Sequence, residues 1–214
     1  MECIFIEFDN KHDVDRQAIS TLHGRLLPHS PVTLLGPEFM REFYYKDLPD
    51  LGLIFGNMAY VDKEPVGFIV ATHNPSKFMI EGIKKRWLKL LYLMAKTILL
   101  HPSRITSIFE AIRIMSKLPA SAKKEKVGEL LSLGVLPEYL KKMKNSNKQC
   151  NISKELVEKA VGQLIERKCF EVRAVVDENN LMAKMFYHGM GWTLDQEKVK
   201  GWKVPTVQFV RQCH

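Results

Sequence analysis

Four residues near the carboxyl end of the chain are spaced so that one helix face can present them together. Asn180, Ala183, Phe186 and Tyr187 fall on one side of a helix. The small Ala183 lets that helix approach a slender ligand or a strand, and Tyr187 projects a hydroxyl from the same side. Both aromatics can also be simple core residues, which we expect for Phe186. Tyr187 is a candidate proton donor, since a phenol has a pKa of about 10.

A second group of candidates lies on a strand predicted at Glu129–Leu136. Gly134 lacks a side chain, which suits close approach of a ligand or a bulge, although a core strand can also contain a glycine. Glu129 at the start of this strand is the first candidate general base, and His73 at the end of an earlier strand is the second. An exposed glutamate at a strand end is more often a surface charge, so both interpretations stay open.

The elements around these residues predict a mixed α/β (α+β) fold, because strand and helix patterns do not alternate regularly. Strands are predicted at Cys3–Phe8, Leu51–Val61, Pro65–Thr72, Glu129–Leu136 and Phe170–Val176, with two more around Gly201 and Pro205. Helices are predicted at Asp13–Leu27, Glu38–Tyr45, Ser153–Arg167 and Asn180–Gly189. A turn at 62–64 is predicted to join two strands as a hairpin, and Pro49 is expected to end the second helix. Residues 140–150 are predicted to form a lysine-rich loop.

Residues 76–126 form a basic segment that we interpret as an inserted helical hairpin in a single domain spanning 1–214. Twelve Lys and Arg against three acids give it a charge of +9, whereas the whole chain carries +8. One helical face is predicted to hold Ile83, Trp87, Leu90, Leu91, Met94 and Ile98, opposite Lys85, Lys89 and Lys96. A second helix is predicted from Ser103, with Ile105, Ile108, Phe109, Ile112 and Met115 as its apolar stripe.

Composition narrows the class of protein. At 214 residues with 46% hydrophobic and 26% charged residues, the chain can bury a core without disulfides or a metal. The four cysteines form no CxxC pair, which indicates reduced thiols, no metal site and a cytoplasmic location. The first ten residues lack the basic and apolar regions of a signal peptide.

Two segments together resemble the GNAT (Gcn5-related N-acetyltransferase) family. The stretch 180–192 is similar to the signature N-x-x-A-x-x-F-Y-x-x-x-G-F, with Trp192 for the last Phe. Upstream, 130–139 looks like the family's fourth strand and its V-x-P-x-Y, with Val135, Pro137 and Tyr139. The resemblance covers nearly the whole chain except 76–126. It implies a mostly antiparallel sheet of six to seven strands, flanked by helices and splayed between strands four and five.

The resemblance also implies a co-substrate and roles for particular residues. Acetyl-CoA would lie between strands four and five, against the backbone of Leu133, Gly134 and Val135. The N–H of Val135 would polarise the thioester carbonyl. Tyr187 would be the general acid that protonates the departing thiolate. Its helix would contribute Asn180, Ala183 and Phe186 to the cofactor site.

The family's phosphate loop, R/Q-x-x-G-x-G/A, is the point where this sequence departs from the pattern. The best match is displaced by the extra segment 140–147 and has lost both glycines; it consists of Lys148, Gln149, Cys150, Asn151, Ile152 and Ser153. A pyrophosphate needs free N–H groups at a helix N-terminus, and the oxygens of Asn151 and Ser153 compete for them. Four nearby lysines supply compensating charge: Lys141, Lys142, Lys144 and Lys148.

The expected function is therefore transfer of acetyl from acetyl-CoA to a primary amine, a small molecule or an amino-sugar, by direct attack in a ternary complex. The alternative is a catalytically degenerate GNAT-like binding or scaffold protein. The basic segment either forms a lid that packs on the domain or on a second copy of the chain, or makes a peripheral membrane contact through 83–118. Nucleic acid is not expected as a partner, because apolar stripes on both helices indicate packing.

Overall fold

A seven-stranded sheet forms the centre of the computed structural model, which describes residues 2–100, 106, 126–144, 151–195 and 205–213. The strand order is β1-β2-β3-β4-β5-β7-β6, and β4 with β5 is the parallel pair among antiparallel neighbours. The strands are β1 Cys3–Phe8, β2 Phe55–Val61, β3 Glu64–Thr72, β4 Val127–Val135, β5 Glu171–Asp177, β6 Thr193–Asp195 and β7 Thr206–Gln212. The expected mixed sheet of six to seven strands is confirmed.

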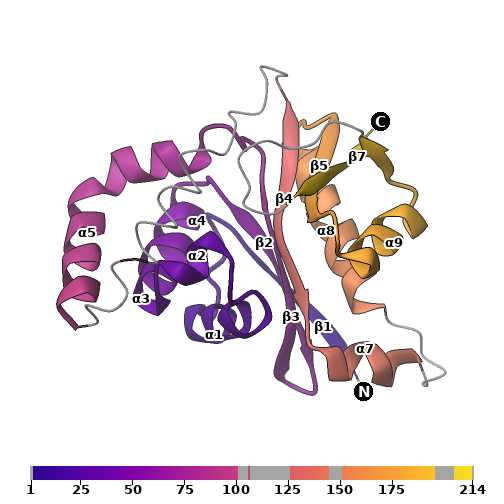
Figure 1. Ribbon diagram of the computed structural model, residues 1–214, viewed down its shortest axis with the longest axis horizontal. Helices are drawn as coiled ribbons and strands as arrows, with labels where there is room; N and C mark the ends of the chain where they lie inside the picture. The colour runs from indigo at the N-terminus through magenta and orange to yellow at the C-terminus, as the bar shows by residue number, and fades with distance from the viewer. Residues whose placement is uncertain (1, 101–105, 107–125, 145–150, 196–204, 214) are drawn as a thin grey trace.

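Helices cover both faces of this sheet (Figure 1). One face carries α1 Arg16–Leu26, α2 Pro31–Leu34, α3 Pro37–Phe39, the π-helix η1 Met40–Asp47, α4 Leu48–Asp50 and, farther out, α5 Phe78–Leu100. The other face carries α8 Ile152–Glu166 and α9 Leu181–Gly189, and α7 Pro137–Lys144 follows β4 at the lower end of the view. The segment 140–144 is thus helical, where a loop was predicted.

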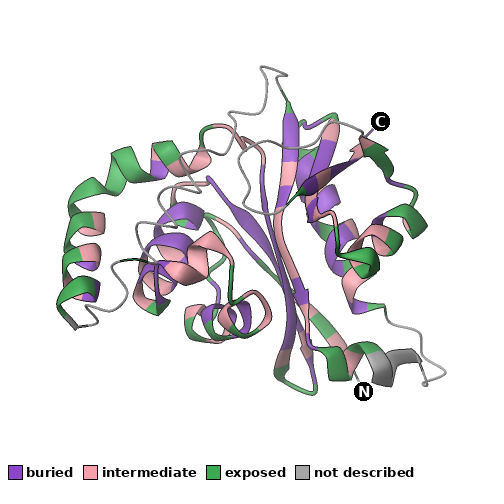
Figure 2. Ribbon diagram, in the orientation of Figure 1, coloured by how far each residue is buried: buried purple, intermediate pink, exposed green. Residues whose placement is uncertain are grey.

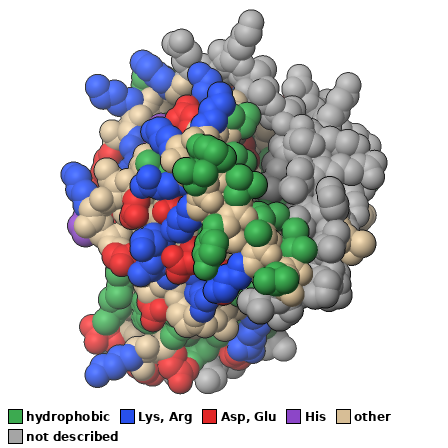
Figure 3. All heavy atoms as spheres, turned by 90° about the vertical axis from the view of Figure 1, so that its left-hand side faces the viewer, with side chains coloured by type: hydrophobic (Ala, Val, Ile, Leu, Met, Phe, Trp, Pro, Cys, Tyr) green, Lys and Arg blue, Asp and Glu red, His purple; other side chains and the backbone are tan. Residues whose placement is uncertain are grey.

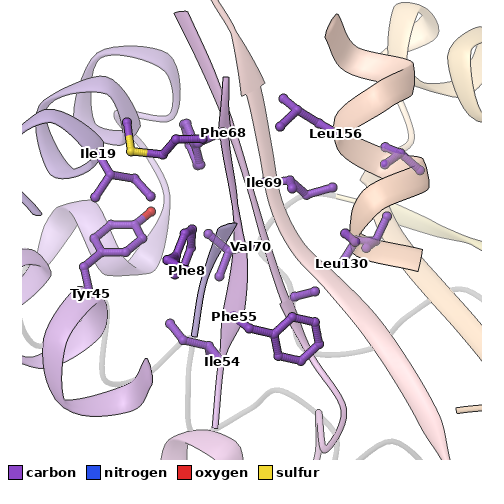
Figure 4. Packing of buried hydrophobic residues seen from close by; sticks show 14 of the residues in the cluster. Phe8, Ile19, Tyr45, Ile54, Phe55, Phe68, Ile69, Val70, Leu130 and Leu156 are labelled. Carbon is purple, nitrogen blue, oxygen red and sulfur yellow. The ribbon is translucent and has the colours of Figure 1, made fainter. Parts of the chain in front are cut away.

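The core has two layers, one on each side of the sheet (Figures 2 and 4). Phe68 and Val70 of β3 point toward α1 and η1, where they meet Ile19 and Tyr45, whereas Ile69 points toward Leu156 of α8. This alternation follows from the two-residue period of a strand and is why β3 reads as a continuous apolar run. The central strands are therefore rigid supports for residues on either face.

The helix predicted at Glu38–Tyr45 is longer than expected. Helical backbone runs from Pro37 to Asp50 through α3, η1 and α4, so Pro49 does not end it. Pro49 follows directly on the π-helix, whose wider turn ends with the N–H of Leu48 donating to the carbonyl of Phe43, so the helical backbone continues past it. The intervening eight residues are π-helical, a form that sequence periodicity does not reveal.

The predicted faces of the first inserted helix are only partly right, since Leu90 and Met94 pack against the core and Lys85 is exposed as expected. In α5, which is kinked at Arg86, Gly82, Leu93 and Thr97 are buried, while Trp87 and Leu91 of the predicted apolar face are exposed. Lys89 and Lys96, predicted on the outer side, reach inward to acids of η1 and α3. The second predicted helix, from Ser103 to Met115, lies outside the described residues except for 106. Among the described helices, none is long and apolar enough to cross a membrane.

A buried histidine holds α1 to the helices that follow it. His23 is fully buried and stacks on Phe68, with Nδ1 2.6 Å from the Tyr45 hydroxyl and Nε2 3.0 Å from Oγ of Ser30. Burial lowers the pKa of His23 from 6.5 to about 4. The imidazole is therefore neutral in the folded protein, with one nitrogen donating a hydrogen bond and the other accepting one.

This geometry predicts a loss of stability in mild acid. Because the folded pKa lies below the unfolded one, the unfolded chain binds the extra proton, and stability falls as the pH drops from about 6.5 toward 4. Between pH 7 and 5 the wild type should lose about 2 kcal/mol more unfolding free energy than His23→Gln, whose amide does not titrate. Urea unfolding at both pH values measures this difference. The exposed His29→Gln is the control, and an equal loss in wild type and His23→Gln would refute the assignment.

Candidate active site

The fourth and fifth strands separate partway along their length. They pair only where Val127–Leu130 faces Glu171–Ala174, although β4 continues to Val135 and β5 to Asp177. The register between β3 and β4 shifts after Val70, which leaves Leu131 as an extra residue in β4 at the point of separation. The bulge bends β4 away from β5, so the expected splay between strands four and five is confirmed.

Glu129 lies in the last paired stretch, on the face that α1 and η1 cover. It stands beside Thr72 of β3 and Arg173 of β5 in the sheet register. Tyr44 of η1 lies close enough to Glu129 for the negative charge of that carboxylate to raise the pKa of the phenol. Tyr44 also shares a hydrogen bond with Ser132 of β4. These polar groups form one cluster beneath η1 and next to the gap.

Electrostatics suit Glu129 to the role of a base. Burial raises the pKa of its carboxyl from 4.5 to about 7, and the positive charge of Arg173 opposes that rise. Arg173 is itself buried, with Nε 2.6 Å from Oε1 of Glu171. A carboxyl with a pKa near neutrality can accept a proton and release it again at physiological pH.

His73, the second candidate base, lies on the opposite face. His73 follows the last residue of β3 and is close enough to Arg167, at the end of α8, for that charge to act on it, whereas Glu129 lies beneath η1. Burial and the nearby Arg167 lower its pKa. Its Nδ1 is buried without a hydrogen-bond partner among the described residues. The two candidate bases therefore lie apart, and only Glu129 has Arg173 and Tyr44 as polar neighbours.

Tyr187 lies on the α8 and α9 side of the sheet. Its ring stacks on Phe209 of β7 at a centroid distance of 5.6 Å and meets Trp192 edge-on at 5.1 Å. Tyr187 is buried, whereas Phe186 is only half-buried, so the expectation that Phe186 is the core aromatic holds only in part. Burial raises the pKa of Tyr187 above its ordinary value, which keeps the phenol protonated.

Asn180 has a structural function at the start of α9. It is the N-cap, and its Oδ1 accepts a hydrogen bond from the backbone N–H of Ala183 at 3.0 Å. Both residues are thus accounted for by helix geometry, with Ala183 only half-buried. Gly134 is explained similarly, because a Cβ there would come within 2.9 Å of Leu26 in α1 and of Phe68. The bulge is at Leu131 rather than at Gly134.

The N-terminus of α8 matches the position of the expected phosphate loop. Asn151 caps the helix, and its Oδ1 accepts from Lys154 N–H at 3.1 Å. Ile152 is buried and begins the helix, one residue earlier than predicted, and Ser153 follows it. Within the described residues the N–H groups of Ile152 and Ser153 have no acceptor. Lys148, Gln149 and Cys150 lie outside the described residues.

Three residues of the cluster escaped sequence reasoning, namely Tyr44, Ser132 and Arg173. Arg173 gave a usable signal, because it is the one charged residue inside the apolar run Val172–Val176 and stands in register with Glu129. Tyr44 and Ser132 gave none, since their approach depends on how η1 packs over β4. No cluster around Glu129 suggests a metal; within the described residues, Glu7, Asp9 and His12 are the only such group and lie elsewhere.

Comparison with known proteins identifies the architecture. No protein-family model and no curated protein matches the chain. Among solved structures, a chain of the NatC complex bound to Gag peptide and CoA shares 16% identity, with a TM-score of 0.56 over 100% of both chains. Arabidopsis thaliana NAA60 in complex with acetyl-CoA shares 17% over 99% of this chain and 98% of that one, with a TM-score of 0.56.

A third neighbour has a name that specifies a small amine. An agmatine N-acetyltransferase shares 15% identity over 99% of this chain and 100% of that one, with a TM-score of 0.55. A fourth, from Desulfovibrio desulfuricans, is described as a putative acetyltransferase of the GNAT family, with 9% identity and a TM-score of 0.56 over 99% of both chains. These likenesses establish the fold.

The pairing of Glu129 with Arg173 can be tested without any substrate. Arg173→Met removes the charge that stabilises the carboxylate, so the pKa of Glu129 should rise further above its value of about 7. Carbon-13 NMR titration of the glutamate carboxyl groups measures the shift. Arg25→Met, at an exposed position, is the matched control. If the pKa of Glu129 were the same in Arg173→Met as in the wild type, the two residues would not interact electrostatically.

Proposed function

We propose that this chain, which has the GNAT fold, is an acyl-CoA-dependent N-acetyltransferase acting on a primary amine. The observation that carries the proposal is the gap between β4 and β5, with a near-neutral carboxyl on one face of the sheet and a protonated phenol on the other. Solved neighbours bound to CoA or acetyl-CoA support the choice of acyl donor.

The residues present fit acetyl-CoA in two respects. The edge of β4 at Leu133, Gly134 and Val135 is not paired with β5, which leaves backbone groups for a pantetheine amide. The N–H groups of Ile152 and Ser153 at the positive end of the α8 dipole suit a pyrophosphate. We assign Lys148, Gln149, Cys150 and Asn151 to this site by their position before α8.

The chemistry divides between the two faces of the sheet. Glu129, as a carboxylate, takes a proton from the amine directly or through water, which frees the lone pair for attack on the thioester carbonyl. The C–N bond forms as the C–S bond breaks, and Tyr187 gives its proton to the departing sulfur. The amide nitrogen then loses its second proton, which returns through water to the Tyr187 phenolate, and Glu129 releases the first proton to solvent. Each proton transfer typically contributes about 10²–10⁴ in rate. Direct attack needs no covalent enzyme intermediate, and the buried Cys169, with a pKa raised to about 11, is a poor nucleophile.

For the acceptor we propose a small amine or an amino-sugar. Neighbours include both an enzyme named for agmatine and a complex holding a peptide, so the fold accommodates either class. The cluster of Glu129, Arg173, Tyr44 and Ser132 supplies carboxyl, guanidinium and hydroxyl groups that match a compact polar acceptor. We place the reaction in the cytoplasm, in keeping with four widely spaced cysteines that form no CxxC pair in the sequence.

One observation favours the second candidate, a non-catalytic binding protein. The Asn151 side chain already accepts a hydrogen bond from the backbone N–H of Lys154. A glycine at this position, as in the family loop, would leave that N–H available to a phosphate. Calorimetry with acetyl-CoA decides between the two candidates. Binding at physiological concentrations supports the enzyme, and no binding at those concentrations would leave the scaffold as the function.

Replacement of Tyr187 by phenylalanine tests the general acid. Tyr187→Phe should lower kcat by about 10²-fold or more and leave the Kd for acetyl-CoA nearly unchanged, since the ring packing against Phe209 and Trp192 is kept. Steady-state kinetics and calorimetry measure the two quantities. The exposed Tyr92→Phe serves as control. A loss of acetyl-CoA binding instead would make Tyr187 a structural residue.

The pH dependence of the rate tests Glu129. Because the carboxyl must be ionised to act as a base, kcat/KM should rise with pH through about 7 and level off above it. Glu129→Gln should lower the plateau by about 10²-fold or more and abolish that inflection. Glu138→Gln, which changes an exposed carboxyl, should keep the wild-type profile. Persistence of the inflection in Glu129→Gln would transfer the role to another group.

A further inference from the structure

The outward face of α5 is apolar, which is unusual for a helix surface in contact with water. Beyond the kink at Arg86, Leu93 and Thr97 are buried against the domain. On the other side of the helix the side chain of Leu88 is 65% exposed and that of Leu99 84%. We define the α5 outer face as the exposed residues of this side, namely Trp87, Leu88, Leu91, Tyr92, Ile98 and Leu99.

Ion pairs fix this orientation from the inner side. Lys89 Nζ lies 2.9 Å from Oδ2 of the buried Asp47, and Lys96 Nζ lies 2.9 Å from Oε1 of Glu38. Turning Lys89 outward would leave the buried Asp47 with Arg86, whose Nε lies 3.6 Å from Oδ1, and turning Lys96 outward would break the ion pair with Glu38. The α5 outer face is held in place on the folded domain rather than formed on contact with a partner.

Positive charge borders the α5 outer face. Lys84 and Lys85 are exposed one turn before Leu88, and Arg86 at the kink is also exposed. The sequence holds no acid from 82 to 109. Figure 3 looks at this side of the molecule and shows hydrophobic side chains gathered with Lys and Arg beside them. Acids also lie on this side of the molecule (Figure 3), but Glu42 and Glu38 pair with Lys89 and Lys96. Among the described residues Lys84 and Lys85 form no ion pair, so their charges are available to a partner that is both negatively charged and apolar.

We propose that the α5 outer face binds an anionic lipid surface. Trp and Tyr suit the boundary between headgroups and acyl chains, the leucines suit the region below it, and Lys84 and Lys85 pair with lipid phosphates. A second copy of the chain is the alternative occupant of this face, and sedimentation distinguishes it from a lipid surface. The helix lies on the membrane and does not span it.

Flotation of the full chain with vesicles tests the proposal. The protein should float with vesicles of phosphatidylcholine and phosphatidylserine at about 3:1, and less with phosphatidylcholine alone or at high salt. Trp87→Gln with Leu91→Gln should lower the partition coefficient at least about ten-fold. Lys84→Gln with Lys85→Gln should lower it about 25-fold on anionic vesicles. Ile4→Gln with Ile6→Gln changes two comparably exposed side chains of β1 and should have no effect.

The outcomes are separable from those of the proposed acetyltransferase. Each variant should keep the wild-type melting temperature and Kd for acetyl-CoA, since the changed side chains are exposed and lie on α5. The proposal is overturned if the wild type fails to float with anionic vesicles, or if Trp87→Gln with Leu91→Gln floats undiminished. Sedimentation that finds a dimer in the wild type and a monomer in that variant, without lipid binding, assigns the surface to a second copy instead.

Discussion

The short parallel pairing of β4 with β5 is the constraint on which the rest of the site depends. Helix α8 clamps the paired half, because Gly128 lacks a Cβ that would come within 2.4 Å of Leu164, so the helix sits directly on the strand. Past Leu130 the bulge at Leu131 releases β4 from β5. One sheet thus combines a rigid anchor with an open edge, and a ligand can occupy that edge without disrupting any existing strand pair.

Buried charge, and not hydrophobicity, decides how α5 docks. The buried carboxylate of Asp47 lies 2.9 Å from Lys89 and 3.6 Å from Arg86. A buried charge without a partner costs several kcal/mol, more than the roughly 1.5–3 kcal/mol gained by burying one leucine side chain. Lys89 therefore turns inward to Asp47, and Trp87 and Leu91 are left outside. A prediction from helical periodicity considers only the polarity of each residue, so it does not include a long-range ion pair such as that of Lys89 with Asp47.

This explains which parts of the molecule the sequence could predict. The strands Cys3–Phe8 and Pro65–Thr72, the turn at 62–64 and the helices around 16–26 and 152–166 follow local patterns, and the structure has them within a few residues. The bulge at Leu131 and the burial of Glu129 were not predictable, because they arise from register and from the packing of η1 over β4. The π-helix that brings Tyr44 there has no local signature. The site was therefore harder to predict from the sequence than the fold, because it depends more on long-range contacts.

One physical effect, burial, gives Glu129 and Tyr187 opposite capacities. It raises the pKa of both, but the carboxyl starts below physiological pH and moves up to about 7, whereas the phenol starts above it and moves farther away. The carboxyl is thereby able to accept a proton and the phenol is kept able to give one. They lie toward opposite faces of the sheet, so the two proton transfers that we propose would take place on opposite sides of the gap between β4 and β5.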